Sequence, residues 1–171
     1  MSHRIRIRMA EADDVDAMHA LLLPYSEKKI VLPRSHDDLF EHLQEFVVAE
    51  YDGRLAGLAA LHVYQSNLAE IRSLVVSDSH QGMGIGRLLV DGCERVATEL
   101  GLERVFALTY VENFFGQLDY AAVQKETLPH KIWTVCIHCE KFSNCDEVAV
   151  EKVLPRSRSG HLPIIEVEQT E

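Results

Sequence analysis

The sequence predicts an α/β domain, a sheet flanked by helices, and three observations support this fold class. Residues 4–8 read Arg-Ile-Arg-Ile-Arg, the alternation of a strand with one buried face. Asp52-Gly53 lies between the apolar runs 47–51 and 55–64, which is typical of a β-hairpin turn. A further apolar run, residues 70–76, is followed by a glycine-rich turn and a long stretch of helical periodicity. Together these segments alternate strands with helices, the pattern that defines the class.

Two helices are expected between the first strand and the hairpin. Residues 12–14 cap the first helix, and its apolar positions recur at helical spacing: Val15, Met18 and Leu22. Pro24 and Pro33 bracket an irregular stretch, residues 25–32. The second helix begins at Ser35, with Asp38 three residues later as a variant capping box. Its expected buried positions are Leu39 and Leu43, with Phe46 as a further candidate.

Caps and apolar runs also place the elements after the glycine-rich turn. The long helix extends to about Leu100, and Gly101 is its expected C-cap. Residues 105–109 read as a buried strand, residues 114–118 as a short helix and residues 148–150 as a late strand. The complete order is β-α-α-β-β-β-α-β-α-β-β, without internal repeats.

The C-terminal stretch, residues 155–171, contains turn formers and then a short apolar run. We expect a loose tail there, with an arm that packs on a neighbour as the alternative. Self-association of two copies through the late strands or this tail remains open.

Composition limits the partners and the compartment. A chain of 171 residues, 47% of them hydrophobic, fits one domain with a sizeable core. No run of about 18 apolar residues is present to cross a membrane, and no signal peptide is recognisable, so a cytoplasmic location is expected. The formal net charge of −10 argues against a nucleic-acid partner, because phosphate backbones require a basic face.

The glycine-rich turn has the chemistry of a phosphate cradle. It reads Gln81-x-x-Gly84-x-Gly86, opens a helix, and offers backbone N–H groups and the positive end of the helix dipole. A P-loop would continue Gly-Lys-Ser/Thr, but Arg87 follows Gly86 here. A dinucleotide fold would need the spacing G-x-G-x-x-G, which is absent.

This motif resembles the coenzyme A pyrophosphate loop of the GNAT N-acetyltransferases, and the element order resembles that family over residues 4–154. The resemblance implies an acyl-CoA N-acyltransferase fold, with flanking helices and a central, mixed but mostly antiparallel sheet that splays in a V after Val76. It implies acetyl-CoA as co-substrate, a transferase domain at 1–154 and a tail at 155–171. The backbone of Leu74 and Val76 would hold the pantetheine arm. The residues implied for the pyrophosphate are Gln81, Gly82, Met83, Gly84, Ile85, Gly86 and Arg87.

The catalytic candidates are a carboxylate and a hydroxyl. Glu70 would remove a proton from the acceptor ammonium through a water; a solvent-facing glutamate at the start of the strand is the alternative. Many family members carry a tyrosine acid where this chain has Phe115, and a glycine where it has Asp119. Thr109 and Tyr110 are therefore the remaining hydroxyls for the leaving thiolate, and release without an acid is also open.

Several segments outside this motif resemble the acetyltransferase domain of N-acetylglutamate synthases: residues 32–35, 39–50, 70–74, 106–109 and 126–131. The resemblance implies transfer to the α-amine of L-glutamate, the first step of arginine biosynthesis, by a short form without a kinase-like domain. It also implies that Arg34 and Lys131 hold the two carboxylates; a surface salt bridge is the alternative for Arg34. Another small amine, a protein N-terminus or a non-catalytic module that binds coenzyme A or metal remain alternatives.

Three of the four cysteines cluster late in the chain. Cys136-x-x-Cys139 contains His138 and is followed by Cys145. These four residues could hold a structural zinc ion. Free thiols and a disulfide are the alternatives. Cys93 lies midway along the long helix and is expected to be a small core residue.

Overall fold

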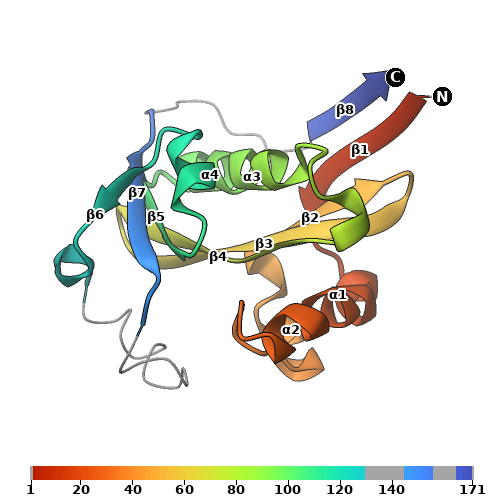
Figure 1. Ribbon diagram of the computed structural model, residues 1–171, viewed down its shortest axis with the longest axis horizontal. Coiled ribbons are helices and arrows are strands. Elements are labelled where there is room, and N and C mark those ends of the chain that lie inside the picture. Colours follow the sequence, from red (N-terminus) through yellow and green to blue (C-terminus); the bar gives the residue numbers. More distant parts are fainter. Residues whose placement is uncertain (1, 130–144, 156–164, 171) are drawn as a thin grey trace.

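An eight-stranded sheet separates two layers of helices (Figure 1). The structure, a computed structural model, describes residues 2–129, 145–155 and 165–170. The strands within those ranges are β1 (Ser2–Met9), β2 (Phe46–Tyr51), β3 (Arg54–Gln65), β4 (Leu68–Val76), β5 (Arg104–Thr109), β6 (Ala121–Val123), β7 (Val148–Val153) and β8 (Ile165–Thr170). The helices there are α1 (Val15–Glu27), α2 (His36–Glu41), α3 (Ile85–Glu99) and α4 (Glu112–Gly116). No helix in the described residues is long and apolar enough to cross a membrane.

The sheet is mixed and mostly antiparallel, as the family resemblance implied. Its strand order is β6-β7-β5-β4-β3-β2-β1-β8, and only β4 and β5 run parallel. Those two strands pair from Leu68–Arg104 to Glu70–Phe106 and then part. The splay is therefore confirmed, but it begins at Glu70 and not after Val76. The shorter ladder leaves most of β4 open on that side.

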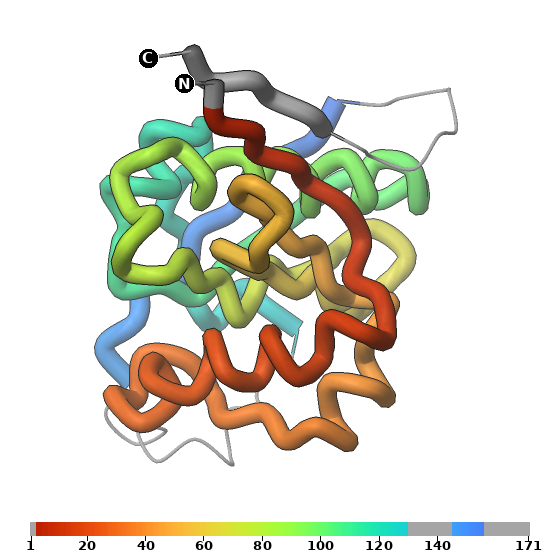
Figure 2. Tube along the Cα trace, turned by 90° about the vertical axis from the view of Figure 1, so that its right-hand side faces the viewer, coloured from red at the N-terminus to blue at the C-terminus, as the bar shows by residue number. Residues whose placement is uncertain are grey.

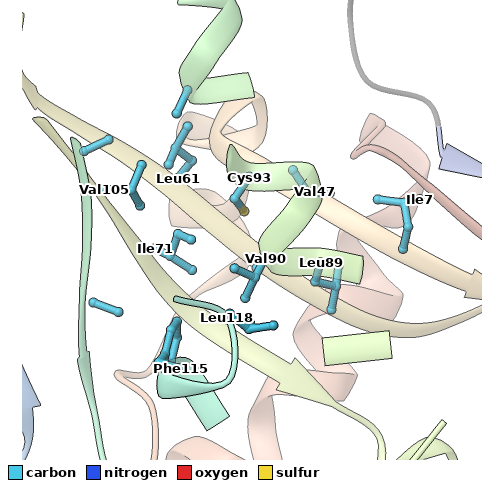
Figure 3. Close-up of a cluster of buried hydrophobic side chains, with 14 of the residues drawn as sticks. Ile7, Val47, Leu61, Ile71, Leu89, Val90, Cys93, Val105, Phe115 and Leu118 are labelled. Atoms are coloured by element: carbon cyan, nitrogen blue, oxygen red, sulfur yellow. The ribbon is translucent and has the colours of Figure 1, made fainter. Parts of the chain in front are cut away.

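Apolar side chains on both faces of the sheet hold the layers together. Helices α3 and α4 cover one face, and α1 and α2 cover the other (Figure 1). The cluster under α3 includes Ile7, Val47, Leu61, Ile71, Leu89, Val90, Cys93, Val105, Phe115 and Leu118 (Figure 3). Cys93 is fully buried, as expected, and burial raises the pKa of its thiol. The opposite cluster joins Met18 of α1 and Leu39 of α2 to the sheet.

Most element boundaries lie near their predicted positions, with informative exceptions. The hairpin turn has positive φ at Asp52 and Gly53, the geometry that the Asp-Gly pair favours. Helix α1 continues through Pro24 to Glu27, so the irregular stretch is shorter than expected. Phe46 begins β2 and does not belong to α2. Its burial there is complete, because the strand turns its side chain towards α1 and α2.

Part of the expected loose tail is ordered as a strand. Residues 165–170 form β8, which pairs antiparallel with β1 from Ser2–Thr170 to Ile7–Ile165. Strands β1 and β8, near the two ends of the chain, therefore lie side by side at one edge of the sheet (Figure 1), and Figure 2 shows β1 crossing that side of the molecule. The pairing satisfies backbone groups of β1 that would otherwise form an exposed sheet edge.

Candidate active site

A pocket of about 540 Å³ opens where β4 and β5 part. The α1–α2 loop, β4, the end of β5 and the residues before β7 contribute to its lining. Ile71 packs under α3, so its neighbours on β4, Glu70 and Arg72, project to the α1–α2 face. Ala107 also packs under α3, and Thr109 shares its face. All these residues line the pocket, which therefore passes through the sheet from one face to the other.

Glu70 has the surroundings of a general base. Its side chain is buried, and one oxygen, Oε2, accepts a hydrogen bond of 2.8 Å from the Tyr64 hydroxyl. The other oxygen accepts no hydrogen bond from the described residues. Burial raises the pKa of the carboxyl, against the opposing effects of the Tyr64 hydrogen bond and of the charges on Arg72, His62 and Arg34. The solvent-facing alternative for this glutamate is thus excluded.

The candidate acids lie across the splay from Glu70. Thr109 is buried, and its Oγ1 accepts a hydrogen bond of 2.9 Å from the Val111 amide. That contact leaves the hydroxyl hydrogen of Thr109 without an acceptor among the described residues. Tyr110 also lines the pocket and is 40% exposed. Phe115, which replaces the tyrosine of many family members, lines the pocket. Asp119, which replaces a glycine, has a φ of 68°, in the left-handed region that glycine adopts readily.

A bulge marks the part of β4 expected to contact the pantetheine arm. Ala60 pairs with Arg72 and Leu58 with Val75, so Ser73 and Leu74 together oppose one residue of β3. Ser73 has a φ of 55°, in the left-handed region. The bulge turns the peptide groups around Leu74 out of the regular ladder. That is the place where the resemblance puts the hydrogen-bond donor to the thioester oxygen.

The carbonyl of Val76, the other expected pantetheine contact, already accepts hydrogen bonds from two side chains. The Tyr25 hydroxyl donates to it at 2.9 Å and the Gln81 amide at 3.2 Å. Both side chains also contact the Asp78 carboxylate, so the single hydroxyl hydrogen of Tyr25 is shared between Asp78 and the Val76 carbonyl. Burial and the Asp78 carboxylate raise the pKa of Tyr25 to about 12, so its hydroxyl stays protonated. The side chain of Gln81 thus stabilises the turn through these hydrogen bonds. Its backbone N–H is the part of Gln81 that could bind a phosphate.

The glycine-rich turn has the geometry that a backbone cradle requires. Gly82 and Gly84 have φ near 80°, and a Cβ added to either would meet no atom within 4 Å. Gly84 is the N-cap of α3, whose first turn holds Ile85, Gly86 and the exposed side chain of Arg87. Open space next to a helix N-terminus and a cation fits a pyrophosphate. Met83 is also exposed in the turn.

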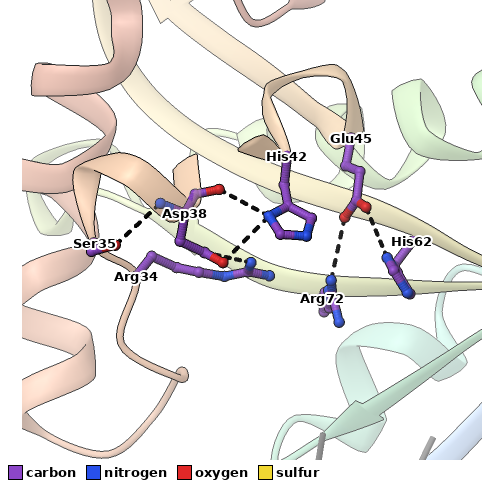
Figure 4. Close-up of polar contacts among 7 residues, drawn as sticks. All are labelled: Arg34, Ser35, Asp38, His42, Glu45, His62 and Arg72. Atoms are coloured by element: carbon purple, nitrogen blue, oxygen red, sulfur yellow. Dashed lines mark hydrogen bonds and ion pairs between the residues drawn. The ribbon is translucent and has the colours of Figure 1, made fainter. Parts of the chain in front are cut away.

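Arg34 lines the pocket and also forms an ion pair with Asp38, the kind of contact named above as the alternative for this residue. Its Nη1 donates to Asp38 at 2.7 Å (Figure 4), and its guanidinium lies over the Phe46 ring at 5.7 Å. Ser35 caps α2 as predicted, by accepting from the Asp38 amide at 3.1 Å. Arg34 is therefore both ion-paired and part of the pocket lining. Lys131 lies outside the described residues.

Four charged residues that line the pocket were not expected from the sequence: Glu27, Lys29, Arg72 and Glu147. Arg72 lies two positions after Glu70, and Glu147 lies just before β7. Burial and the charge on Glu70 raise the pKa of Glu147, against the charge on Lys125. A signal for Arg72 was present: two charged residues at alternate positions of an otherwise apolar strand indicate a face turned to a polar site.

The cysteine cluster lies largely outside the described residues, which include neither Cys136 nor His138 nor Cys139. Cys145 is described, and its sulfur lies 3.4 Å from the Lys125 ammonium. In the described part of the chain, no three His, Cys, Asp or Glu side chains are grouped to hold a metal ion. A structural zinc at this cluster stays a prediction.

Comparison with known proteins shows which protein family contains similar chains. A model of the acetyltransferase (GNAT) family matches residues 14–120. The uncharacterized N-acetyltransferase CT2212 of Chlorobaculum tepidum is 40% identical over 148 residues, which are 86% of this chain and 96% of that protein. The amino-acid acetyltransferase of Mycobacterium tuberculosis is 39% identical over 121 residues, 69% of each chain. A solved structure of the N-acetylglutamate synthase of Neisseria gonorrhoeae, complexed with coenzyme A and N-acetyl-glutamate, matches 89% of this chain with a TM-score of 0.81 and 28% identity. This chain spans 35% of that longer protein.

Proposed function

Because the chain belongs to the GNAT acetyltransferase family and is an acetyl-CoA-dependent N-acetyltransferase, we propose that its acceptor is the α-amine of L-glutamate. The reaction would be the opening step of arginine biosynthesis. One observation carries the proposal: the buried carboxylate of Glu70 and the guanidinium of Arg34 line the same pocket. A dianionic amino acid needs a base for its ammonium and a cation for a carboxylate. The complex of the Neisseria enzyme with N-acetyl-glutamate supports the same choice.

Each side chain has a role in this chemistry. Acetyl-CoA supplies the acetyl group as a thioester. Glu70, whose second oxygen accepts no hydrogen bond from the described residues, takes a proton from the ammonium and leaves a nucleophilic amine. An amide at the β4 bulge near Leu74 donates a hydrogen bond to the thioester oxygen. The amine attacks the thioester carbon and the carbon–sulfur bond breaks. Thr109, on the opposite face of the sheet, gives its hydroxyl hydrogen to the leaving sulfur and regains a proton released from the new amide nitrogen.

The proposal assigns one carboxylate of glutamate to Arg34. Lys131 stays a prediction for the other carboxylate, since it lies outside the described residues. We assign the transferase unit to residues 1–154. Residues 155–171 then form an appended segment that ends in β8.

A polyamine is the second candidate acceptor, and the pocket lining gives a specific reason. Three carboxylates line it: Glu27, Glu70 and Glu147. A cluster of negative charge favours an acceptor with several ammonium groups. Arg34 and Arg72 oppose that choice, because they would repel such a ligand.

Coenzyme A release from acetyl-CoA, measured across L-amino acids, polyamines and a buffer blank, tests the acceptor. L-Glutamate should give release far above the others, and Arg34→Ala should raise its KM without changing the KM for acetyl-CoA. Arg95→Ala is the matched control, because Arg95 forms an i,i+4 ion pair with Asp91 outside the pocket. Strong release with a polyamine would replace glutamate. Acetyl-CoA binding without release for any amine would support a non-catalytic module.

A further inference from the structure

Arg72 lies next to the proposed base on the same face of the same strand. It follows Glu70 by two positions on β4, where that strand has already left β5. Two positions along a strand separate their Cα atoms by roughly 6.6 Å. Both side chains line the pocket. A small ligand can therefore contact both groups at once.

The guanidinium of Arg72 has unused hydrogen-bonding capacity. Its Nη2 donates to Glu45 Oε2 over 3.3 Å, which is long for a charged pair. Glu45 also binds His62 at 2.8 Å through Oε1, so it is shared between two partners (Figure 4). The Nε of Arg72 is buried and has no acceptor among the described residues. A poorly paired guanidinium is costly to bury, and an incoming anion would relieve that cost.

Arg34 approaches the pocket from a different segment. It comes from the loop before α2, donates to Asp38 at 2.7 Å (Figure 4) and lies over Phe46. Its charge is therefore balanced more closely than that of Arg72. The two guanidinium groups give the pocket two separate contacts for negative groups, and only the Arg72 contact lies beside the base.

We propose that Arg72 binds the α-carboxylate of the acceptor and so restricts the enzyme to amines that carry a carboxylate on the adjacent carbon. This inference rests on the proposed transfer to an amino acid and names one of its contacts. In an α-amino acid the nitrogen and the carboxyl carbon are about 2.5 Å apart. An amine held at Glu70 therefore places its carboxylate near the next residue on that face of β4, which is Arg72. Arg34 is then left for the distal carboxylate, and the predicted contact of Lys131 would add to one of these two and not replace either.

Paired substrates separate the two arginines. γ-Aminobutyrate keeps the amine and the distal carboxylate of glutamate but lacks the α-carboxylate, whereas L-norvaline keeps only the α-carboxylate. Arg72→Gln should lower kcat/KM for L-glutamate and L-norvaline about 10- to 100-fold. At a pH well above the pKa of Glu70 in both proteins, where the loss of the Arg72 charge no longer changes the ionisation of that carboxyl, it should leave γ-aminobutyrate unchanged, measured as kcat/KM or as an inhibition constant where turnover is absent. Arg34→Ala should affect L-glutamate and γ-aminobutyrate and spare L-norvaline.

Arg104→Gln is the matched control, since Arg104 is a strand arginine paired with Glu151 outside the pocket. It should change no acceptor preference, and the KM for acetyl-CoA should be unchanged in all variants. Equal loss for L-glutamate and γ-aminobutyrate in Arg72→Gln, or no loss for either, would overturn the inference. If the enzyme acetylates a different α-amino acid, glutamate fails as acceptor, and Arg72 is tested with that amino acid and its decarboxylated amine. Turnover only of amines without a carboxylate would refute both proposals.

Discussion

Glu70 is held in a state that suits proton removal. Its carboxyl is buried beside the sheet splay, and burial raises its pKa above the ordinary value of 4.5. The Tyr64 hydrogen bond and nearby cations, of which Arg72 has the largest effect, limit that rise. Glu70 is therefore a stronger base than an exposed glutamate. The nearby cations still allow its carboxyl to ionise.

Activity should therefore rise with pH through a value above 4.5. The protonated carboxyl cannot accept a proton, so kcat/KM is low below the raised pKa and levels off above it. Glu70→Gln should lower kcat roughly 10²–10⁴-fold and abolish this limb of the pH profile, with acetyl-CoA binding retained. The check is a pH series of kcat/KM for both proteins, with exposed Glu41→Gln as control. A normal rate in Glu70→Gln would remove this residue as base.

Single residues were predicted best where the chemistry follows from residue type. Glu70 and Arg34 could be placed from resemblance, and both line the pocket. The doubt about Asp119 is resolved by its backbone, because aspartate tolerates the left-handed conformation better than most residues. Arg72 was missed although its alternate spacing with Glu70 was a usable signal, because the groups that lie around it follow from the register of β4 in the folded sheet.

At the scale of elements, the cradle depends on the N-terminal end of α3. Gly84 has a φ of 80°, and so Gly84→Ala adds backbone strain of about 1–2 kcal/mol without a steric clash in the protein. The new methyl group would occupy open space at the helix N-terminus. Steady-state kinetics should show a raised KM for acetyl-CoA with kcat less affected.

Gly101→Ala is a matched control at the other end of the same helix. Gly101 has a φ of 77° and equally open surroundings, so the substitution should cost similar stability. The KM for acetyl-CoA should stay normal in this variant. An equal rise in both variants would mean that destabilisation of α3, and not the cradle, controls binding.

Elements were predictable because their signals are local. Apolar periodicity and caps placed every helix and most strands, and Ser35 and Asp52-Gly53 behave as their residue types require. Element boundaries were predicted less well where they depend on tertiary packing. Phe46, expected with the second helix, begins β2 and is buried there in the core. The β4 bulge at Ser73 has no local signal, since serine rarely takes a positive φ.

At the scale of the whole molecule, the pocket and the sheet edge depend on contacts between distant segments. The pocket lining comes from the α1–α2 loop, β3, β4, β5, α4 and the residues before β7. Pairing of β4 with β5 stops at Glu70, which opens the gap six residues earlier than the resemblance suggested. The partner of β1 likewise lies more than 150 residues away in sequence, at Ile165–Thr170. Such pairings are set by the whole fold and not by periodicity.

The place of β8 predicts that stability and catalysis can be separated. It lies four strands from β4 in the sheet, roughly 19 Å from the splay. A chain ending at residue 155 should have a lower Tm and self-associate through the exposed edge of β1, because unpaired strand edges recruit one another. Its kcat and its KM for acetyl-CoA should stay normal at low temperature, since the pocket is untouched.

Thermal melts, light scattering and kinetics on the same samples check this separation. A full-length chain with Val167→Pro, opposite Ile5, distinguishes lost pairing from lost length, because proline cannot complete the ladder. If pairing matters, both variants melt early and associate. Loss of activity in both at permissive temperature would instead mean that β8 supports the splay across the whole sheet, and that residues 1–154 do not form a self-sufficient transferase unit.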